Sequence, residues 1–75
     1  MPFYKWMIQY HLHKETVLGT VARFIAQNSH LFSRARSHHK SHRILESLEP
    51  SYELYAAFDQ AWNEFRKFQL ESLDA

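Results

Sequence analysis

An apolar stripe runs at helical spacing through the second half of the sequence. Its members recur every three or four residues and are Leu54, Tyr55, Phe58, Ala61, Trp62, Phe65 and Phe68. This period places them on one face of an α-helix. Pro50 stands before the stripe and interrupts any helix that precedes it. The pattern predicts a long amphipathic helix after Pro50, and it is the strongest periodic signal in the chain.

Two shorter stripes predict helices in the first thirty residues. Pro2 suits the first turn of a helix, because its missing N–H has no partner there. The apolar positions that follow it at i, i+3, i+4 and i+7 are Phe3, Trp6, Met7 and Tyr10. Thr16 can cap a second helix that ends near Asn28. The stripe of that helix consists of Leu18, Val21, Ala22 and Ile25.

A third short helix is expected after Ser37, a residue type that caps helix N-termini well. Its inward-facing arc consists of Ser41, Ile44, Leu45 and Leu48. The opposite face centres on His39, Arg43 and Glu46. Leu31 and Phe32 are expected to lie in the preceding loop as apolar anchors.

The size and composition of the chain fit one small helical domain. With 75 residues and no cysteine, it has no disulfide, thiolate nucleophile or cysteine-based zinc site, and it suits a reducing compartment. The 16% of aromatic residues can supply the core, because each buried ring removes about 150–250 Å² from water. Trp6, Phe58, Trp62 and Phe65 are therefore expected to be core residues. We predict a single all-α domain over residues 1–75, a compact bundle of four to five short helices.

Charge is distributed unevenly along this chain. The net charge is only +1, but residues 1–45 carry seven Lys and Arg against Glu15, whereas residues 46–75 carry seven acids against Arg66 and Lys67. No acid interrupts the segment 34–43. We name its candidate binding residues the basic strip, which consists of Arg34, Arg36, His39, Lys40 and Arg43. A dipolar molecule is expected, with an anionic partner for its basic part.

Two blocks of the sequence resemble a known family. The segments Phe3–Tyr10 (FYKWMIQY) and Phe58–Trp62 (FDQAW) resemble the signatures of the YozE-like proteins, which are small uncharacterised proteins of Gram-positive bacteria. The likeness spans nearly the whole chain and implies a sterile-alpha-motif-like (SAM-like) helical fold with no established activity. The chain departs from the family at residues 40–43, where Lys-Ser-His-Arg stands in place of an acidic, tyrosine-containing entry to the third helix. A function of the basic strip is therefore not implied by the resemblance.

The basic strip favours nucleic-acid binding over other functions. Its cations are interleaved with Ser33, Ser37 and Ser41, whose hydroxyls can donate to phosphates. An exposed ring among Tyr4, Phe24 and Tyr52 could add a stacking platform for a base. The alternative is a SAM-like module that binds an acidic protein surface or itself through opposed charged surfaces. Ordinary solubilising charge remains a third interpretation.

Other function classes lack support in the sequence. There is no GxSxG, HExxH or P-loop motif, and a domain this small is not expected to enclose a pocket of several hundred Å³, so we expect no enzyme, cofactor or small-molecule substrate. His38 and His42 stand at i, i+4, but two imidazoles among cations do not make a metal site, and we expect them on a solvated face. Neither a signal peptide nor a membrane-spanning stretch is present, so a cytoplasmic location with no membrane partner is expected. The oligomeric state stays open.

Overall fold

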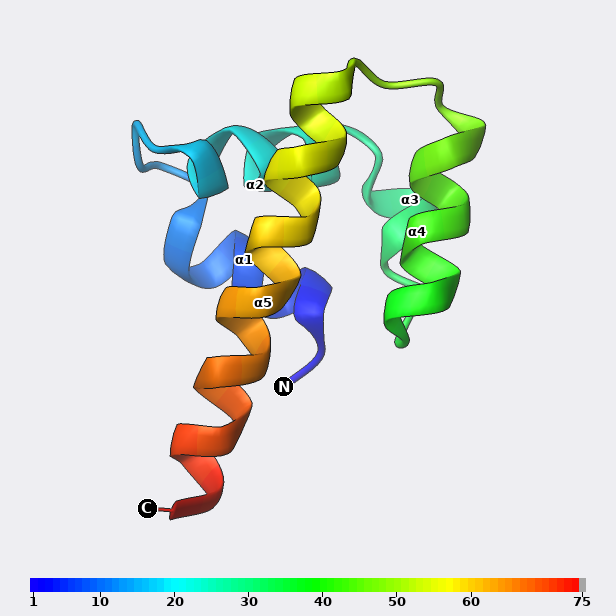
Figure 1. The fold of residues 1–75 in the computed structure, drawn as a ribbon. Helices are drawn as coiled ribbons and strands as arrows, with labels where there is room; N and C mark the ends of the chain where they lie inside the picture. Colours follow the sequence, from blue (N-terminus) through cyan, green and yellow to red (C-terminus); the bar gives the residue numbers. More distant parts are fainter. Residues whose placement is uncertain (75) are drawn as a thin grey trace.

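The computed structural model describes residues 1–74 and the side chains of residues 1–72. Its helices are α1 (Phe3–His11), α2 (Val17–Gln27), α3 (Ser29–Phe32), α4 (His38–Ser47) and α5 (Tyr52–Asp74), and this part of the chain contains no strand. The predicted all-α bundle is confirmed. In Figure 1, α5 is the long axis of the molecule, and its last turns extend beyond the other helices.

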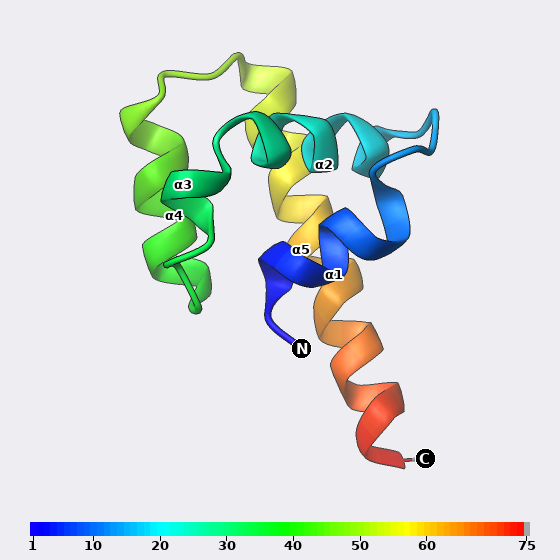
Figure 2. The same cartoon turned by 180° about the vertical axis from the view of Figure 1, so that it is seen from behind.

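The two sides of α5 are covered differently. Helices α1 and α2 pack against each other and against α5, on the face that Figure 2 turns toward the viewer. Helix α4 stands alongside α5 and is connected to the rest of the bundle through the short α3. The arrangement leaves one long side of α4 facing α5 and the opposite side facing solvent.

The core is built largely from aromatic rings, as the composition predicts. Phe3 stacks on Trp62 with ring centroids 4.1 Å apart, and its edge meets Phe58 at 5.7 Å and Phe65 at 5.5 Å. Trp6 packs against Phe65 at 5.4 Å. These five side chains are all buried, which confirms the expected core positions of Trp6, Phe58, Trp62 and Phe65. Pairs of rings in such tilted and offset arrangements add stability beyond their buried area.

Both predicted caps are present. The Thr16 hydroxyl oxygen accepts a hydrogen bond from the Gly19 N–H at 3.0 Å, and the Ser37 hydroxyl oxygen accepts one from the Lys40 N–H at 3.1 Å. The predicted arc of α4 is confirmed as well, since Ser41 and Leu45 are buried. Buried Ser41 satisfies its hydroxyl by donating to the His38 carbonyl at 3.0 Å.

The residues before α4 differ from the sequence interpretation. Leu31 and Phe32 do not lie in a loop but in the single turn of α3, which follows α2 after Asn28. The Phe32 ring is 1% exposed and meets Phe24 and Phe58 at 6.1 Å each. Burial of this ring stabilises a helical turn that is too short to be stable by its own propensity.

The loop between α1 and α2 is held by one glycine and one arginine. A Cβ atom on Gly19 would collide with the carbonyl of Lys14, so this close approach of loop and helix requires glycine. Arg23 on α2 donates to the carbonyls of Leu12 at 3.1 Å and Lys14 at 2.8 Å. Gly19 thus lies inside α2 because the helix packs closely against the preceding loop at this position.

The link between α4 and α5 passes through a left-handed residue. Glu49 has φ of 49°, directly after Leu48 caps α4, and Pro50 follows. A left-handed residue at this position ends a helix, and glycine adopts that conformation most readily. None of the helices in residues 1–74 combines the length and the apolar character that crossing a bilayer requires.

Candidate functional site

The structure places the whole basic strip on the outside of α4 and of the loop before it. Arg34 and Arg36 lie in the segment between α3 and α4, and His39, Lys40 and Arg43 lie on α4. All five side chains are exposed. Their orientation follows from the apolar pattern, because the buried side of α4 turns the intervening positions toward solvent.

Three cations of the strip surround one shallow depression of about 240 Å³. Its lining consists of Arg34, Ala35, Lys40, Arg43 and Ile44. Ala35 is buried and its N–H donates to the Phe32 carbonyl at 3.0 Å, which fixes the loop that carries Arg34. Arg36 and His39 belong to the same exposed surface but not to the depression. Residues from two segments therefore converge on a small cationic hollow with apolar walls.

The four cations of the strip form no ion pair with any carboxylate among the side chains of residues 1–72. Two acids of this region contact histidines instead. Glu46 Oε1 lies 3.1 Å from His42 Nδ1, and Asp59 Oδ1 lies 3.8 Å from His38 Nε2. No carboxylate among these side chains therefore lies within ion-pair distance of a cation of the strip.

The charges on α4 oppose its helix dipole. The first turn of α4 contains Lys40 and no acid, and Glu46 lies near its other end. A helix is stabilised by acids at its N-terminus and by bases at its C-terminus, each by about 0.3–1 kcal/mol. On α4 the base stands near the N-terminus and the acid near the C-terminus, so this distribution of charge destabilises the helix. The positive end of the helix dipole also adds to the positive potential of the strip. Local rules of this kind are commonly broken where a surface serves a function.

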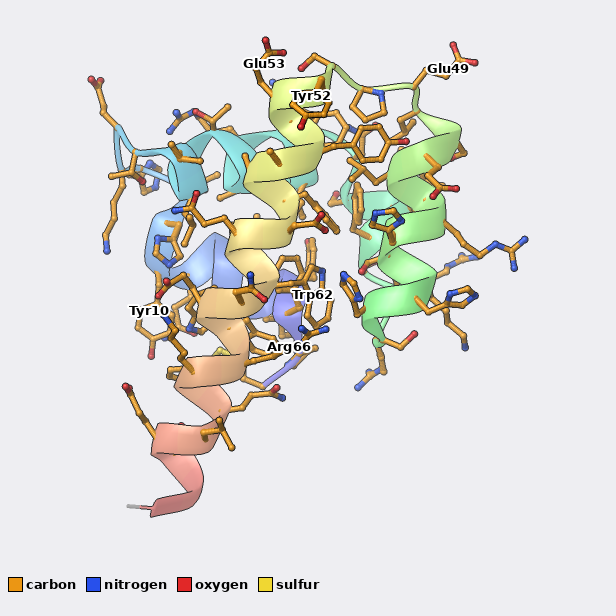
Figure 3. The ribbon with its side chains drawn as sticks, in the orientation of Figure 1. Tyr10, Glu49, Tyr52, Glu53, Trp62 and Arg66 are labelled. Atoms are coloured by element: carbon orange, nitrogen blue, oxygen red, sulfur yellow. The ribbon has the colours of Figure 1, made fainter. Side chains whose placement is uncertain are left out.

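Two acidic residues lie beyond the other end of α4. Figure 3 shows Glu49 and Glu53 projecting from the end of the molecule at which α4 passes into α5. The expected dipolar character is thus present along α4, with the strip near its beginning and these acids beyond its end.

The aromatic residues considered for stacking do not accompany the strip. Tyr52 is 84% exposed, but it lies at the first turn of α5 beside Glu53, at the acidic end. Tyr4 and Phe24 are partly buried against the core.

The surface of the strip therefore offers cations, the His39 imidazole and the hydroxyls of Ser33 and Ser37, but no exposed Phe, Tyr or Trp ring. The hydroxyl of Ser41, expected to donate to phosphates, is buried and donates to the His38 carbonyl instead.

The expectation that His38 and His42 lie on a solvated face holds only in part. The edge of the His38 ring meets Trp62 at 5.1 Å, and the His42 ring lies 5.8 Å from Tyr55 and 6.4 Å from Phe58. Both imidazoles are half-buried between α4 and α5, at the margin of the apolar arc. No group of three or more His, Cys, Asp or Glu suited to a metal ion occurs within residues 1–74.

A larger groove, which the sequence did not indicate, lies between α2 and the start of α5. Its volume is about 560 Å³, and its walls include Val17, Phe24, Leu54 and Ala57. Val17 is 50% exposed. The sequence analysis expected no enclosed pocket of several hundred Å³, and this open groove does not contradict that, because two diverging helices can leave a groove without enclosing it.

Comparison of the chain with protein-family models, curated proteins and solved structures found no match. The resemblance to the YozE-like proteins stays a prediction from the sequence.

Proposed function

We propose that the protein is a non-enzymatic binding module that holds the phosphate backbone of a nucleic acid on its basic strip. The observation that supports this most is the convergence of Arg34, Lys40 and Arg43 on one depression without a neutralising carboxylate among the described side chains. Such a role fits a cytoplasmic protein without cysteine.

The chemistry of the strip favours phosphates over bases. Guanidinium groups bind phosphate oxygens through two parallel hydrogen bonds, and Lys adds a mobile positive charge. No exposed Phe, Tyr or Trp among the described side chains accompanies the strip to stack on a base, and one shallow hollow cannot read base edges in a groove. We therefore expect binding with little sequence preference.

A shift assay with short DNA and RNA duplexes at several salt concentrations tests this proposal. If about four phosphates are neutralised, the logarithm of the binding constant should fall by about 3 to 4 for each tenfold rise in salt. The double substitution Arg34→Glu and Lys40→Glu should abolish the complex.

A charge-matched control separates the site from total charge. Lys5→Glu with Lys14→Glu makes the same change of net charge on exposed residues of α1 and of the loop after it, outside the strip, and this variant should retain most of the binding. A flat salt response, or equal loss in both double variants, would contradict a phosphate site on the strip.

A second candidate function is association with an acidic protein surface, including that of another copy. The observation that favours it is the separation of the strip from Glu49 and Glu53 at opposite ends of α4, which permits head-to-tail contacts. This is also the use that the SAM-like resemblance suggests. Light scattering at low and high salt tests it, since self-association by charge should appear at low salt and disappear at high salt.

A further inference from the structure

Two imidazole rings of α4 contact α5 at the margin of the buried arc of α4. His38 and His42 face the same side of α4 with ring centroids 5.7 Å apart, and they meet the Trp62 and Tyr55 rings of α5. Their side chains remain 39% and 31% exposed, so solvent protons reach both. The edge of the contact between α4 and α5 therefore contains two titratable side chains.

The charges around His38 come from both helices. On α5, Asp59 Oδ1 lies 3.8 Å from His38 Nε2, and the positive charge of Arg66 also acts on the ring. On α4, His42 is the titratable neighbour. Burial, followed by Arg66 and His42, lowers the pKa of His38, while Asp59 opposes this. Figure 3 shows Trp62 and Arg66 together on the side of α5 that faces α4.

The surroundings of His42 are different. Its Nδ1 lies 3.1 Å from Glu46 Oε1 on the same helix, and the rings that it meets on α5 belong to Tyr55 and Phe58. Its charged neighbour therefore moves with α4. A proton on His38, in contrast, meets the positive charge of Arg66 on α5 and the partly buried space beside Trp62.

His38 is also close to the basic strip. It stands two positions after Arg36 and two before Lys40, in the first turn of α4. A positive charge placed there acts on an anion at the strip over roughly a Debye length, which is about 8 Å at physiological ionic strength.

We propose that α4 is a proton-sensitive arm, in which protonation of His38 loosens the contact with Trp62 and tightens the binding of phosphate polyanions at the basic strip. The second half of this proposal rests on the proposed function. The two effects are linked, because a polyanion that binds the protonated form better must in turn increase the affinity of His38 for protons.

Fluorescence of Trp62 tests the arm without any ligand. Since Trp6 lies 4.8 Å from His11 and would respond to that imidazole, the measurement uses Trp6→Phe, which leaves Trp62 as the only indole. Protonated imidazole quenches a neighbouring indole, and a loosened α4 exposes it to water. Between pH 8 and pH 5 the emission should fall and shift to longer wavelength, with a midpoint below the ordinary histidine value of about 6.5.

The matched variant is Trp6→Phe with His38→Gln, which keeps a polar side chain and removes the titration. Its emission should be independent of pH in this range. A transition that persists unchanged in this variant, or no transition with His38 present, overturns the arm. A Trp6→Phe, His42→Gln variant should keep the pH-dependent change in emission. Loss of the change in that variant would show that His42, and not His38, is the responsible histidine, and it would overturn the proposal.

Binding of a short DNA duplex tests the coupling. His39 lies within the strip, so the measurement uses a His39→Gln background with and without His38→Gln, at pH 7.5 and pH 5.5 and constant salt. One added charge about 10 Å from a phosphate should tighten binding about twofold in water without salt, and salt reduces this gain. In a low-salt buffer, the affinity of the His38 chain should therefore gain up to about twofold more per nearby phosphate, on going from pH 7.5 to pH 5.5, than that of the His38→Gln chain.

The outcomes separate the two proposals. If no duplex binds at either pH, the proposed function and the coupling fail together. The pH dependence of Trp62 fluorescence still tests whether protonation of His38 loosens α4. If the duplex binds equally at both pH values in the presence of His38, the coupling alone is overturned.

Discussion

The ring of Phe3 lies flat on the indole of Trp62, with centroids 4.1 Å apart and planes 13° from parallel. This contact joins the first turn of α1 to the middle of α5, across almost the full length of the sequence. Trp62 also contacts α4, since its ring and the His38 ring meet edge-on with centroids 5.1 Å apart. Trp62 is therefore the side chain at which the two sides of the bundle meet.

Removal of the Trp62 ring should destabilise the protein more than any change at the surface. Trp62→Ala leaves a large cavity between α1, α4 and α5 and should cost about 3–5 kcal/mol, a large part of the stability of a small domain. Trp62→Phe keeps a ring on Phe3 and removes an indole N–H that is buried without a hydrogen-bond partner, so it should cost clearly less. Urea unfolding followed by circular dichroism measures both. Equal stability of Trp62→Ala and the unmodified chain would contradict the burial of this ring.

Glycine at position 49 should stabilise the protein. Glu49 has φ of 49°, a conformation that costs a residue with a Cβ atom about 1 kcal/mol relative to glycine. Glu49→Gly should therefore raise the free energy of unfolding by up to about 1 kcal/mol, with part of the gain offset by the greater freedom of glycine in the unfolded chain. The control is Glu49→Ala, which removes the same charge but keeps the Cβ atom. If both variants gain equally, the effect comes from charge and not from the backbone.

Helix positions and caps could be predicted from the sequence because they depend on local chemistry. Thr16 and Ser37 cap the helices that follow them, and the period of Leu54 to Phe68 determines the buried face of α5. Each of these features is determined by residues that are close to one another in the sequence. The exposure of Lys40 and Arg43 follows from the period of α4, whereas the position of Arg34 beside them depends on the turn at Phe32 and Ala35.

The contacts of His38 and His42 could not be predicted in the same way. Their spacing places them beside the apolar arc of α4. Whether side chains at that edge contact solvent or the aromatic rings of α5 is determined only by the position of α5. The α3 turn at Leu31 and Phe32 likewise depends on a distant pocket between Phe24 and Phe58. The groove beside Val17 arises from the angle between α2 and α5, for which no local signal exists.

Reversal of the Lys40 charge should stabilise the fold even though it weakens binding. Lys40 is in the first turn of α4, where a negative charge interacts favourably with the helix dipole. Lys40→Glu should raise the free energy of unfolding by about 0.3–1 kcal/mol at low salt, and Lys40→Gln by a smaller amount. The gain should shrink in 1 M NaCl, because salt screens the dipole. A destabilised Lys40→Glu variant would show that Lys40 is not the misplaced charge that the structure indicates.

Stability should decrease as the pH falls below neutrality. Burial is the main cause that lowers the pKa of His11 and of His38, with further contributions from Lys14 and Arg66 respectively. The unfolded chain therefore takes up protons at about pH 6.5, before the folded protein does, and protonation draws the equilibrium toward the unfolded state. This part of the stability is fully present above pH 6.5 and is lost progressively as the pH falls toward the lowered values. Urea unfolding at pH 7.5, 6.5 and 5.5 should show the decrease, and the double variant His11→Gln with His38→Gln should show a smaller slope. A chain that is equally stable at all three values, or more stable at pH 5.5, would contradict the lowered pKa of both imidazoles.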